Sequence, residues 1–266
     1  MMRRLLITGA AGEIGSVLRL PLREVAHSLR LNDIRALTQE HPCEEIFTAD
    51  LHDPDVALAA TREVDCIVHM AGVPRENAWE PILRNNIETV YTLFEAARLN
   101  GVRRIVFASS NHVTGFYRSD HTVDSTVPVR PDSRYGVSKV FGEALARLYA
   151  DKHGMEMACL RIGSFRQRPQ NVRELATWIS PRDLTNLVRC CVSAAQFDFL
   201  VIYAVSANRR NLWADRDRDV VGWQPQDDAE QFAADLERLG PSTTDRFHGG
   251  QNCVRELTRD PTTIQP

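Results

Sequence analysis

The chain reads Thr8-Gly9-Ala10-Ala11-Gly12-Glu13-Ile14-Gly15 directly after a short apolar run at residues 5–7. Glycines spaced in this way between a strand and a helix let backbone N–H groups approach a pyrophosphate, which then lies at the helix N-terminus. The first glycine permits a tight turn, the second admits the phosphates, and the third lets the helix pack closely on the strand. The stretch predicts a dinucleotide-binding turn of an α/β fold, and a glycine-rich turn without a ligand is the alternative.

Short apolar runs alternate with helical stretches along most of the chain, which is the pattern of βαβ units. Several of the runs are apolar throughout, as strands covered by helices on both faces require. We therefore predict an α/β protein with a Rossmann-type doubly wound parallel sheet, helices on both faces and a small C-terminal substrate lobe. The expected strands are residues 4–8, 29–32, 45–48, 66–70, 105–108, 158–162 and 200–205, and the expected helices are 12–25, 56–62, 81–100, 134–152 and 182–194.

Asp33 ends the second expected strand, near the roughly 20-residue offset at which an acid binds the adenosine ribose hydroxyls. A carboxylate at this place repels a 2′-phosphate, so we expect NAD rather than NADP, although Arg35 nearby argues in the other direction. Asp50-Leu51 and Ala71-Gly72 follow the third and fourth strands, where an open α/β sheet presents its carboxyl edge to a ligand.

Tyr135-Gly136-Val137-Ser138-Lys139 places a tyrosine and a lysine four residues apart on one helix face. A free tyrosine is a poor base at neutral pH, and a neighbouring ammonium favours the phenolate. We therefore expect Lys139 to lower the pKa of Tyr135, which would act as the base. Lys139 and Lys152 are the only lysines in the chain, which weakens the alternative of an incidental pair.

The fifth expected strand ends in the polar cluster Ser109-Ser110-Asn111-His112, at the carboxyl edge of the sheet. We expect Ser110 to bond the reacting oxygen, and Asn111 and His112 to contact the substrate. Serine and asparagine capping a turn are the alternative. No metal is expected, because no set of ligands at metal spacing surrounds His112.

The composition is that of an ordinary globular protein, with 266 residues, a net charge of -3, 43% hydrophobic and 25% charged residues. The two signs of charge are interspersed, so we expect neither nucleic acid nor a membrane surface as a partner. No stretch approaches the roughly 18 apolar residues of a membrane span, and no signal peptide develops. The six cysteines lack a Cys-x-x-Cys pattern and are expected to be reduced, in a cytoplasmic protein.

The glycine turn, Asp33, Ser110, Tyr135-x-x-x-Lys139 and Leu160-Arg161-Ile162-Gly163 resemble the extended short-chain dehydrogenase/reductase family over about residues 3–205. Within it the chain most resembles the uronate dehydrogenases. That resemblance lies in Phe107-Ala108-Ser109-Ser110-Asn111-His112, Arg161-Ile162-Gly163-Ser164, Asn171-x-Arg173 with Thr177-Trp178, and Gly222-Trp223-x-Pro225. The predicted cofactor site comprises Gly9, Gly12, Glu13, Ile14, Gly15, Asp33, Asp50, Leu51, Met70, Ala71, Gly72, Asn86, Tyr135, Lys139 and Ile162.

The resemblance implies NAD-dependent oxidation of a hexuronate, such as galacturonate or glucuronate, at C1 to the aldarolactone. It also implies that Arg173 holds the sugar carboxylate, and that Ser110, Asn111, His112 and Ser164 contact hydroxyls. A guanidinium suits bidentate carboxylate binding, and Arg166 and Arg168 in the same segment are alternatives. Pro74, where relatives can carry a small polar residue near the nicotinamide, has no N–H to offer. A homo-oligomer is expected by analogy.

These observations divide the chain into an expected NAD-binding core at residues 1–163 and a substrate-binding segment with a small C-terminal lobe at 164–266. The second part is interleaved with the last strand within one compact domain. A nucleotide-sugar epimerase or dehydratase is the rival function. The region after Ile162 is short for burying a nucleotide, however, and Asn111 and His112 stand where a dehydratase needs an acid. A non-catalytic NAD-sensing protein is a further alternative.

Overall fold

The computed structural model of the chain describes residues 2–238, 240 and 246–264. Its centre is a seven-stranded sheet in the order β3-β2-β1-β4-β5-β6-β9, and every pair of neighbouring strands is parallel. The predicted Rossmann-type doubly wound sheet is confirmed, strand by strand. The strands are β1 (Met2–Thr8), β2 (Ala26–Asp33), β3 (Glu44–Thr48), β4 (Cys66–His69), β5 (Arg104–Ser110), β6 (Glu156–Ile162) and β9 (Phe199–Ala204).

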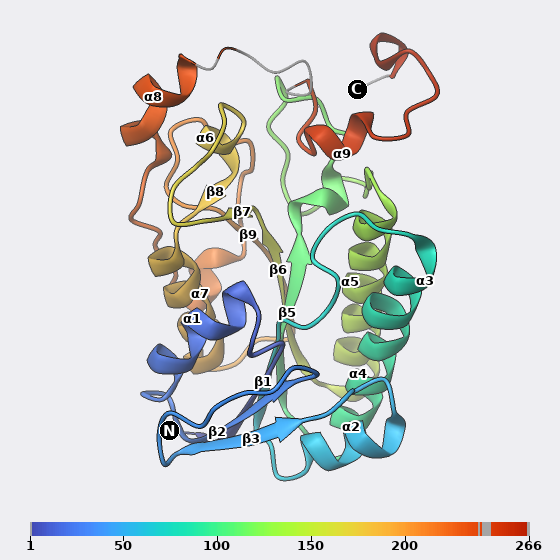
Figure 1. Cartoon of the computed structure of the whole chain (residues 1–266), viewed down its shortest axis with the longest axis vertical. Coiled ribbons are helices and arrows are strands. Elements are labelled where there is room, and N and C mark those ends of the chain that lie inside the picture. The colour runs from blue at the N-terminus through green and yellow to red at the C-terminus, as the bar shows by residue number, and fades with distance from the viewer. Residues whose placement is uncertain (1, 239, 241–245, 265–266) are drawn as a thin grey trace.

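Helices cover both faces of this sheet (Figure 1). On one face α1 and α7 pack together, and Leu18 and Leu187 join the core cluster beneath them. On the other face α2, α4 and α5 enclose a second apolar cluster that includes Phe94 and Phe107. These helices are α1 (Glu13–Leu22), α2 (Pro54–Thr61), α4 (Thr89–Leu99), α5 (Arg134–His153) and α7 (Pro181–Ser193).

The single helix predicted over residues 81–100 is interrupted in the structure. A short α3 (Trp79–Ile82) continues into a π-helical segment, Leu83–Glu88, before α4 begins. The N–H of Thr89 bonds to the carbonyl of Arg84, which is the longer i→i−5 spacing. Such π turns arise from tertiary demands that periodicity does not show.

The N-terminus of α5 is set by local sequence. The side chain of Ser133 caps the helix by accepting the N–H of Gly136 at 3.0 Å. At the other end Gly154 takes the left-handed conformation, with φ of 64°, and stops the helix. Tyr135 therefore lies in the first turn of a 20-residue helix, beside the carboxyl end of β5.

Apart from α7, which covers the sheet beside α1, and β9, which joins the sheet, the elements that follow β6 gather beyond the carboxyl ends of β5 and β6 (Figure 1). The tail returns to the core, where Trp223 is buried in the cluster under α7 and Trp213 stacks on Tyr203 at 5.3 Å between ring centroids. In the described part of the chain no helix is both long and apolar enough to cross a membrane. The elements after β6 other than α7 and β9 are β7 (Ser164–Phe165), α6 (Glu174–Thr177), β8 (Trp178–Ile179), α8 (Ala233–Glu237) and α9 (Gln251–Val254), with 3₁₀ turns at Arg218–Val221, Ala229–Phe232 and Pro261–Thr263.

Candidate active site

The backbone of the glycine turn after β1 packs closely on itself and on the loop after β4, so that residues larger than glycine do not fit there. Gly9 has a φ of 68°, and a Cβ there would lie 2.6 Å from the backbone nitrogen of Ala71. A Cβ at Gly15 would lie 2.1 Å from the carbonyl oxygen of Gly9. Glu13 and Ile14 follow in the first turn of α1, and no side chain among the described residues caps that helix. The turn thus presents backbone N–H groups at a helix N-terminus, as a pyrophosphate site requires.

Asp33 is joined to this turn at the end of β2. Its Oδ2 accepts the N–H of Ala11 at 2.9 Å, while its Oδ1 accepts the backbone N–H of Arg35 at 3.0 Å. The Arg35 side chain also pairs with Asp33, at 3.4 Å, and is mostly exposed. The carboxylate is therefore fixed beside the glycine turn, and Arg35 partly neutralises it there.

The third and fourth strand ends carry the rest of the predicted cofactor site. Although burial acts to raise the pKa of the Asp50 carboxyl, the His52 N–H at 3.0 Å and the Arg84 guanidinium at 2.7 Å hold that pKa below the usual range. Leu51 beside it is buried. Met70 and Ala71 follow β4 and are partly exposed. The site thus continues along the carboxyl edge of the sheet.

Asn86, which the sequence places in the predicted cofactor site, is hydrogen-bonded to the loop after β4 and to α5. Its Oδ1 accepts the N–H of Val73 at 2.7 Å, and its Nδ2 donates to the Val73 carbonyl and to the Ser138 hydroxyl. It lies close to Gly72, which has a φ of 134°. The buried Asn86 amide therefore ties the loop after β4 to α5.

Tyr135, Lys139 and Ser110 come together between α5 and the end of β5. All three side chains are buried. Burial raises the pKa of Tyr135 to about 12, and a hydrogen bond with Ser110 opposes this rise. The Lys139 ammonium lies 5.5 Å from the centroid of the Tyr135 ring, and burial lowers the pKa of Lys139 to about 8.

Lys139 is expected to lower the pKa of Tyr135, whereas the net shift in the protein alone has the opposite direction. Loss of water from around the phenol outweighs any attraction of the ammonium. The Lys139 ammonium lies over ring faces, 5.1 Å from the centroid of Phe107 as well as 5.5 Å from that of Tyr135. The spacing correctly paired the two side chains but carried no information on their burial.

Asn111 and His112 form the 3₁₀ turn Asn111–Thr114 that follows Ser110. His112 lies edge-to-face with Tyr135, at 5.9 Å between ring centroids. Within the described residues, Asn111 Nδ2 is buried and has no hydrogen-bond partner. Since a buried amide donor without a partner is costly, this atom fits a site that a polar ligand completes.

The three arginines of the segment after β6 have different surroundings. Arg166 pairs with the buried carboxylate of Glu174 at 2.9 Å, and Arg168 is largely exposed, 3.6 Å from Asp235. Arg173 is partly buried, and its Nε donates to the carbonyl of His248 at 2.7 Å. Ser164 on β7 bonds Thr177 at 2.8 Å, and Ile162 precedes it at the end of β6.

Three acids near the site were not predicted from the sequence. Glu76, in the loop after β4, accepts the N–H of Tyr135 at 2.8 Å, and Asp132 lies 2.6 Å from His112. Glu143 is buried one helical turn beyond Lys139 and pairs with Arg161. Of these only Glu143 had a local signal, its spacing on the face that carries Tyr135 and Lys139.

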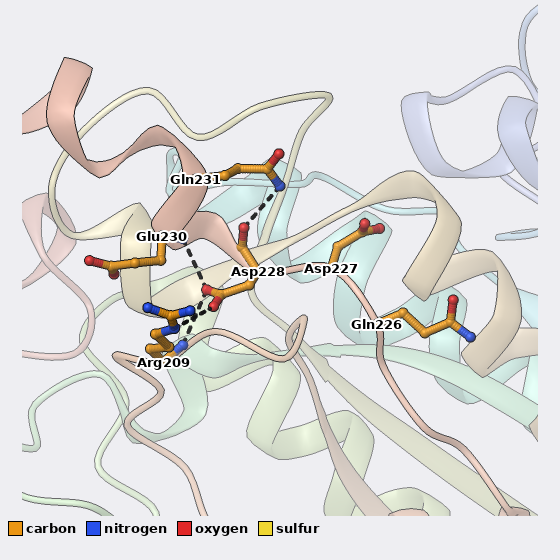
Figure 2. A pocket seen from close by; sticks show the side chains of 6 residues that line it. All are labelled: Arg209, Gln226, Asp227, Asp228, Glu230 and Gln231. Atoms are coloured by element: carbon orange, nitrogen blue, oxygen red, sulfur yellow. Dashed lines mark hydrogen bonds and ion pairs between the residues drawn. The ribbon is translucent and has the colours of Figure 1, made fainter.

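A pocket lies in the tail, lined by residues outside this site (Figure 2). It carries three carboxylates and one guanidinium, and each carboxylate already has a partner. Asp227 pairs with Arg182, Asp228 with Arg209, and Glu230 with Arg210. Such a surface does not favour an anionic ligand. The lining residues are Arg209, Gln226, Asp227, Asp228, Glu230 and Gln231.

Comparison with known proteins identifies the lineage. Residues 5–179 match the NAD dependent epimerase/dehydratase family. The chain belongs to this family. It is 44% identical to the uronate dehydrogenase of Pseudomonas putida, over 88% of each chain.

Solved structures of relatives superpose closely on this one. The glucuronic acid dehydrogenase from Chromohalobacter salexigens is 40% identical, with a TM-score of 0.92 over 96% of this chain and 97% of that one. A variant of the uronate dehydrogenase from Agrobacterium tumefaciens, complexed with NAD, is 41% identical, with a TM-score of 0.91 over 96% and 98%. The predicted resemblance to uronate dehydrogenases, the enzyme class and the NAD cofactor are confirmed. The alternative of a non-catalytic sensor is therefore set aside.

Proposed function

We propose that the protein oxidises the C1 hydroxyl of a hexuronate, such as galacturonate or glucuronate, to the aldarolactone. The observation that carries the proposal is the convergence of Tyr135, Ser110 and His112 in a family whose similar members are named for uronates. We also propose that residues 1–163 hold the cofactor and that residues 164–266 supply the sugar side and a small C-terminal lobe.

The proposed cofactor site is the set of residues predicted from the sequence. This set suits NAD because its glycine turn is tight and its acid is held in a fixed position. Gly12 and the first turn of α1 bind the pyrophosphate, and Asp33 accepts from the adenosine ribose. Lys139 donates to the nicotinamide ribose. When bound, NAD⁺ supplies the hydride acceptor for the C1 hydrogen. Asn86, a member of that set, also holds the loop after β4 in place.

In the proposed mechanism Tyr135 takes the proton of the C1 hydroxyl, while the Ser110 hydroxyl orients that oxygen. Asn111 Nδ2, His112 and Ser164 bind the other sugar oxygens. Arg173 holds the carboxylate at the far end of the sugar. We choose Arg173 over Arg166 and Arg168 because Arg166 is committed to Glu174 and Arg168 lies on the exposed side of the segment.

The experiment is an absorbance assay for NADH with the purified protein. Galacturonate, glucuronate, their parent neutral hexoses and nucleotide sugars are each offered with NAD⁺ or NADP⁺. Reduction of NAD⁺ by uronates and not by neutral hexoses supports the proposal and its arginine contact. If no free sugar reduces NAD⁺ while a nucleotide sugar is isomerised or dehydrated, the substrate is wrong and the epimerase or dehydratase rival is right.

We further propose that the protein is a cytoplasmic homo-oligomer. Its six cysteines carry free thiols, which suits a reducing compartment. On α5 apolar residues at helical spacing form a stripe, and the side chains at its two ends are nearly half exposed. The stripe consists of Val137, Phe141, Ala144 and Leu148. An apolar stripe left in water favours pairing with a second copy. Light scattering of the protein in solution checks this, and a monomeric mass would contradict it.

A further inference from the structure

His112 and Asp132 form a hydrogen-bonded pair beside Tyr135. Nδ1 of His112 lies 2.6 Å from Oδ2 of Asp132. The Asp132 side chain is fully buried, whereas about one fifth of the His112 side chain is exposed. The pair therefore runs from the protein interior to the site, with the acid inside and the imidazole outside.

The orientation of the Asp132 carboxylate is fixed from several sides. The hydroxyl of Ser133 donates to Oδ1 at 2.6 Å, and the Ser133 hydroxyl oxygen in turn caps α5 by accepting the N–H of Gly136. Two backbone segments approach Oδ2 so closely that a Cβ at Gly115 or Gly249 would lie 1.8 or 1.7 Å from it. With Oδ1 held by Ser133, the carboxylate keeps Oδ2 towards His112.

A turn near the C-terminus, residues 247–253, links this pair to the proposed carboxylate-binding side. The N–H of Gly249 donates to the carbonyl of Gly115 at 2.9 Å. One residue earlier, the carbonyl of His248 accepts Nε of Arg173 at 2.7 Å. The same turn thus lies against Arg173 and against the oxygen of Asp132 that faces the imidazole.

We propose that Asp132 is a positioning residue that keeps a proton on Nδ1 of His112, so that Nε2 meets a sugar hydroxyl as an acceptor. A carboxylate only accepts hydrogen bonds, so the ring nitrogen that faces it carries the proton. In a neutral imidazole the other nitrogen is then the acceptor. This inference deepens the proposed oxidation of a hexuronate and rests on it for the identity of the hydroxyl.

The tautomer of His112 is measured by NMR of the imidazole nitrogens in protein containing ¹⁵N-histidine, and His112→Gln assigns the signals. At about pH 9, above the ordinary range of histidine, the wild-type ring should be protonated on Nδ1. In Asp132→Asn the amide oxygen takes the position of Oδ1, where it accepts the Ser133 hydroxyl. The NH₂ group then takes the position of Oδ2 and faces the ring. The proton should then move to Nε2. A wild-type ring protonated on Nε2, or the same tautomer in both proteins, overturns the proposal.

The kinetic counterpart is a change in sugar binding. Asp132→Asn should raise the KM for the hexuronate about tenfold, the effect of one hydrogen bond, with a smaller change in kcat and unchanged NAD⁺ binding. Asp120→Asn is the matched control, since Asp120 lies 2.7 Å from His121 in a pair that is about half exposed. It should leave KM unchanged. Equal KM values for Asp132→Asn and wild type overturn the proposal.

The two readouts separate this inference from the proposed function. If the wild-type protein oxidises no hexuronate, the proposed function fails, and the wild-type tautomer still decides whether Asp132 orients His112. If Asp132→Asn does not fold, the wild-type spectrum alone decides, because a ring protonated on Nε2 is incompatible with the proposed role.

Discussion

Arg161 on β6 and Glu143 on α5 are joined by two hydrogen bonds, from Nε at 2.9 Å and from Nη2 at 2.8 Å. Both side chains are buried. The hydroxyl of Ser109 donates to the same carboxylate at 2.5 Å, and Nη1 of Arg161 donates to the Tyr203 hydroxyl at 2.8 Å. The helix that carries Tyr135 is therefore fastened to β5, β6 and β9 by one buried ionic group.

Glu143→Gln should destabilise the protein strongly, because it leaves the Arg161 charge buried without its counter-charge. Breaking such a pair typically costs about 3–5 kcal/mol. Urea unfolding followed by circular dichroism measures the loss. Asp151→Asn breaks the exposed Arg147–Asp151 pair on the same helix and should have no measurable effect. Equal unfolding midpoints for the two variants would contradict the interpretation.

Tyr135→Phe should abolish turnover while leaving NAD⁺ binding intact. Removing the hydroxyl removes the proposed base, and general-base catalysis contributes roughly 10²–10⁴-fold to a rate. The phenyl ring still fills the buried site beside His112. Single-turnover assays give the rate, and calorimetric titration with NAD⁺ gives the affinity. Tyr91→Phe, at an exposed position on α4, is the control and should retain full activity.

The rate should rise with pH through the neutral range. The pKa of Tyr135 is raised to about 12, so the phenol is protonated at neutral pH, and each one-unit increase in pH below that value gives about tenfold more phenolate. A base of this kind works better as pH increases. The check is kcat/KM for the hexuronate from about pH 6 to pH 8. A plateau across this range would mean that bound cofactor and substrate bring the base into its ionised form.

The sheet was predictable because each strand and turn is determined by a pattern within a short stretch of sequence. Strands covered on both faces carry apolar runs, so residues 66–68 of β4 and 157–160 of β6 are visible in the sequence, and the spacing of Gly9, Gly12 and Gly15 specifies the turn between β1 and α1. The interruption of the helix at Leu83–Glu88 was not predicted, because the apolar spacing over residues 81–100 is that of a continuous helix; Asn86 within this segment holds the loop after β4.

The candidate site was predictable only where its residues are close in sequence. Tyr135 and Lys139 are one helical turn apart, whereas Glu76 reaches the N–H of Tyr135 from 59 residues away. Gly249 lies against Asp132 from the far end of the chain. The direction of the pKa shift of Tyr135 also depends on burial, which the four-residue spacing does not reveal.

Arg173→Lys should raise the KM for the hexuronate by about tenfold or more, since an ammonium replaces a planar group suited to two hydrogen bonds with a carboxylate. The kcat should change less, because the contact lies at the far end of the sugar. Arg168→Lys, on the exposed part of the same segment, is the matched control and should behave as wild type. If Arg168→Lys or Arg166→Lys has the larger effect, the carboxylate is held by a different arginine.

Asp33→Asn should weaken NAD⁺ binding and reduce discrimination against NADP⁺. The substitution removes the negative charge that repels a 2′-phosphate, while Arg35, now without its ionic partner 3.4 Å away, is freed to attract that phosphate. Fluorescence titrations with both cofactors measure the ratio of affinities. The double variant Asp33→Asn with Arg35→Ala tests the cause, because it should lose the gain for NADP⁺ and keep the loss for NAD⁺. An unchanged ratio in the single variant would show that discrimination arises elsewhere in the site.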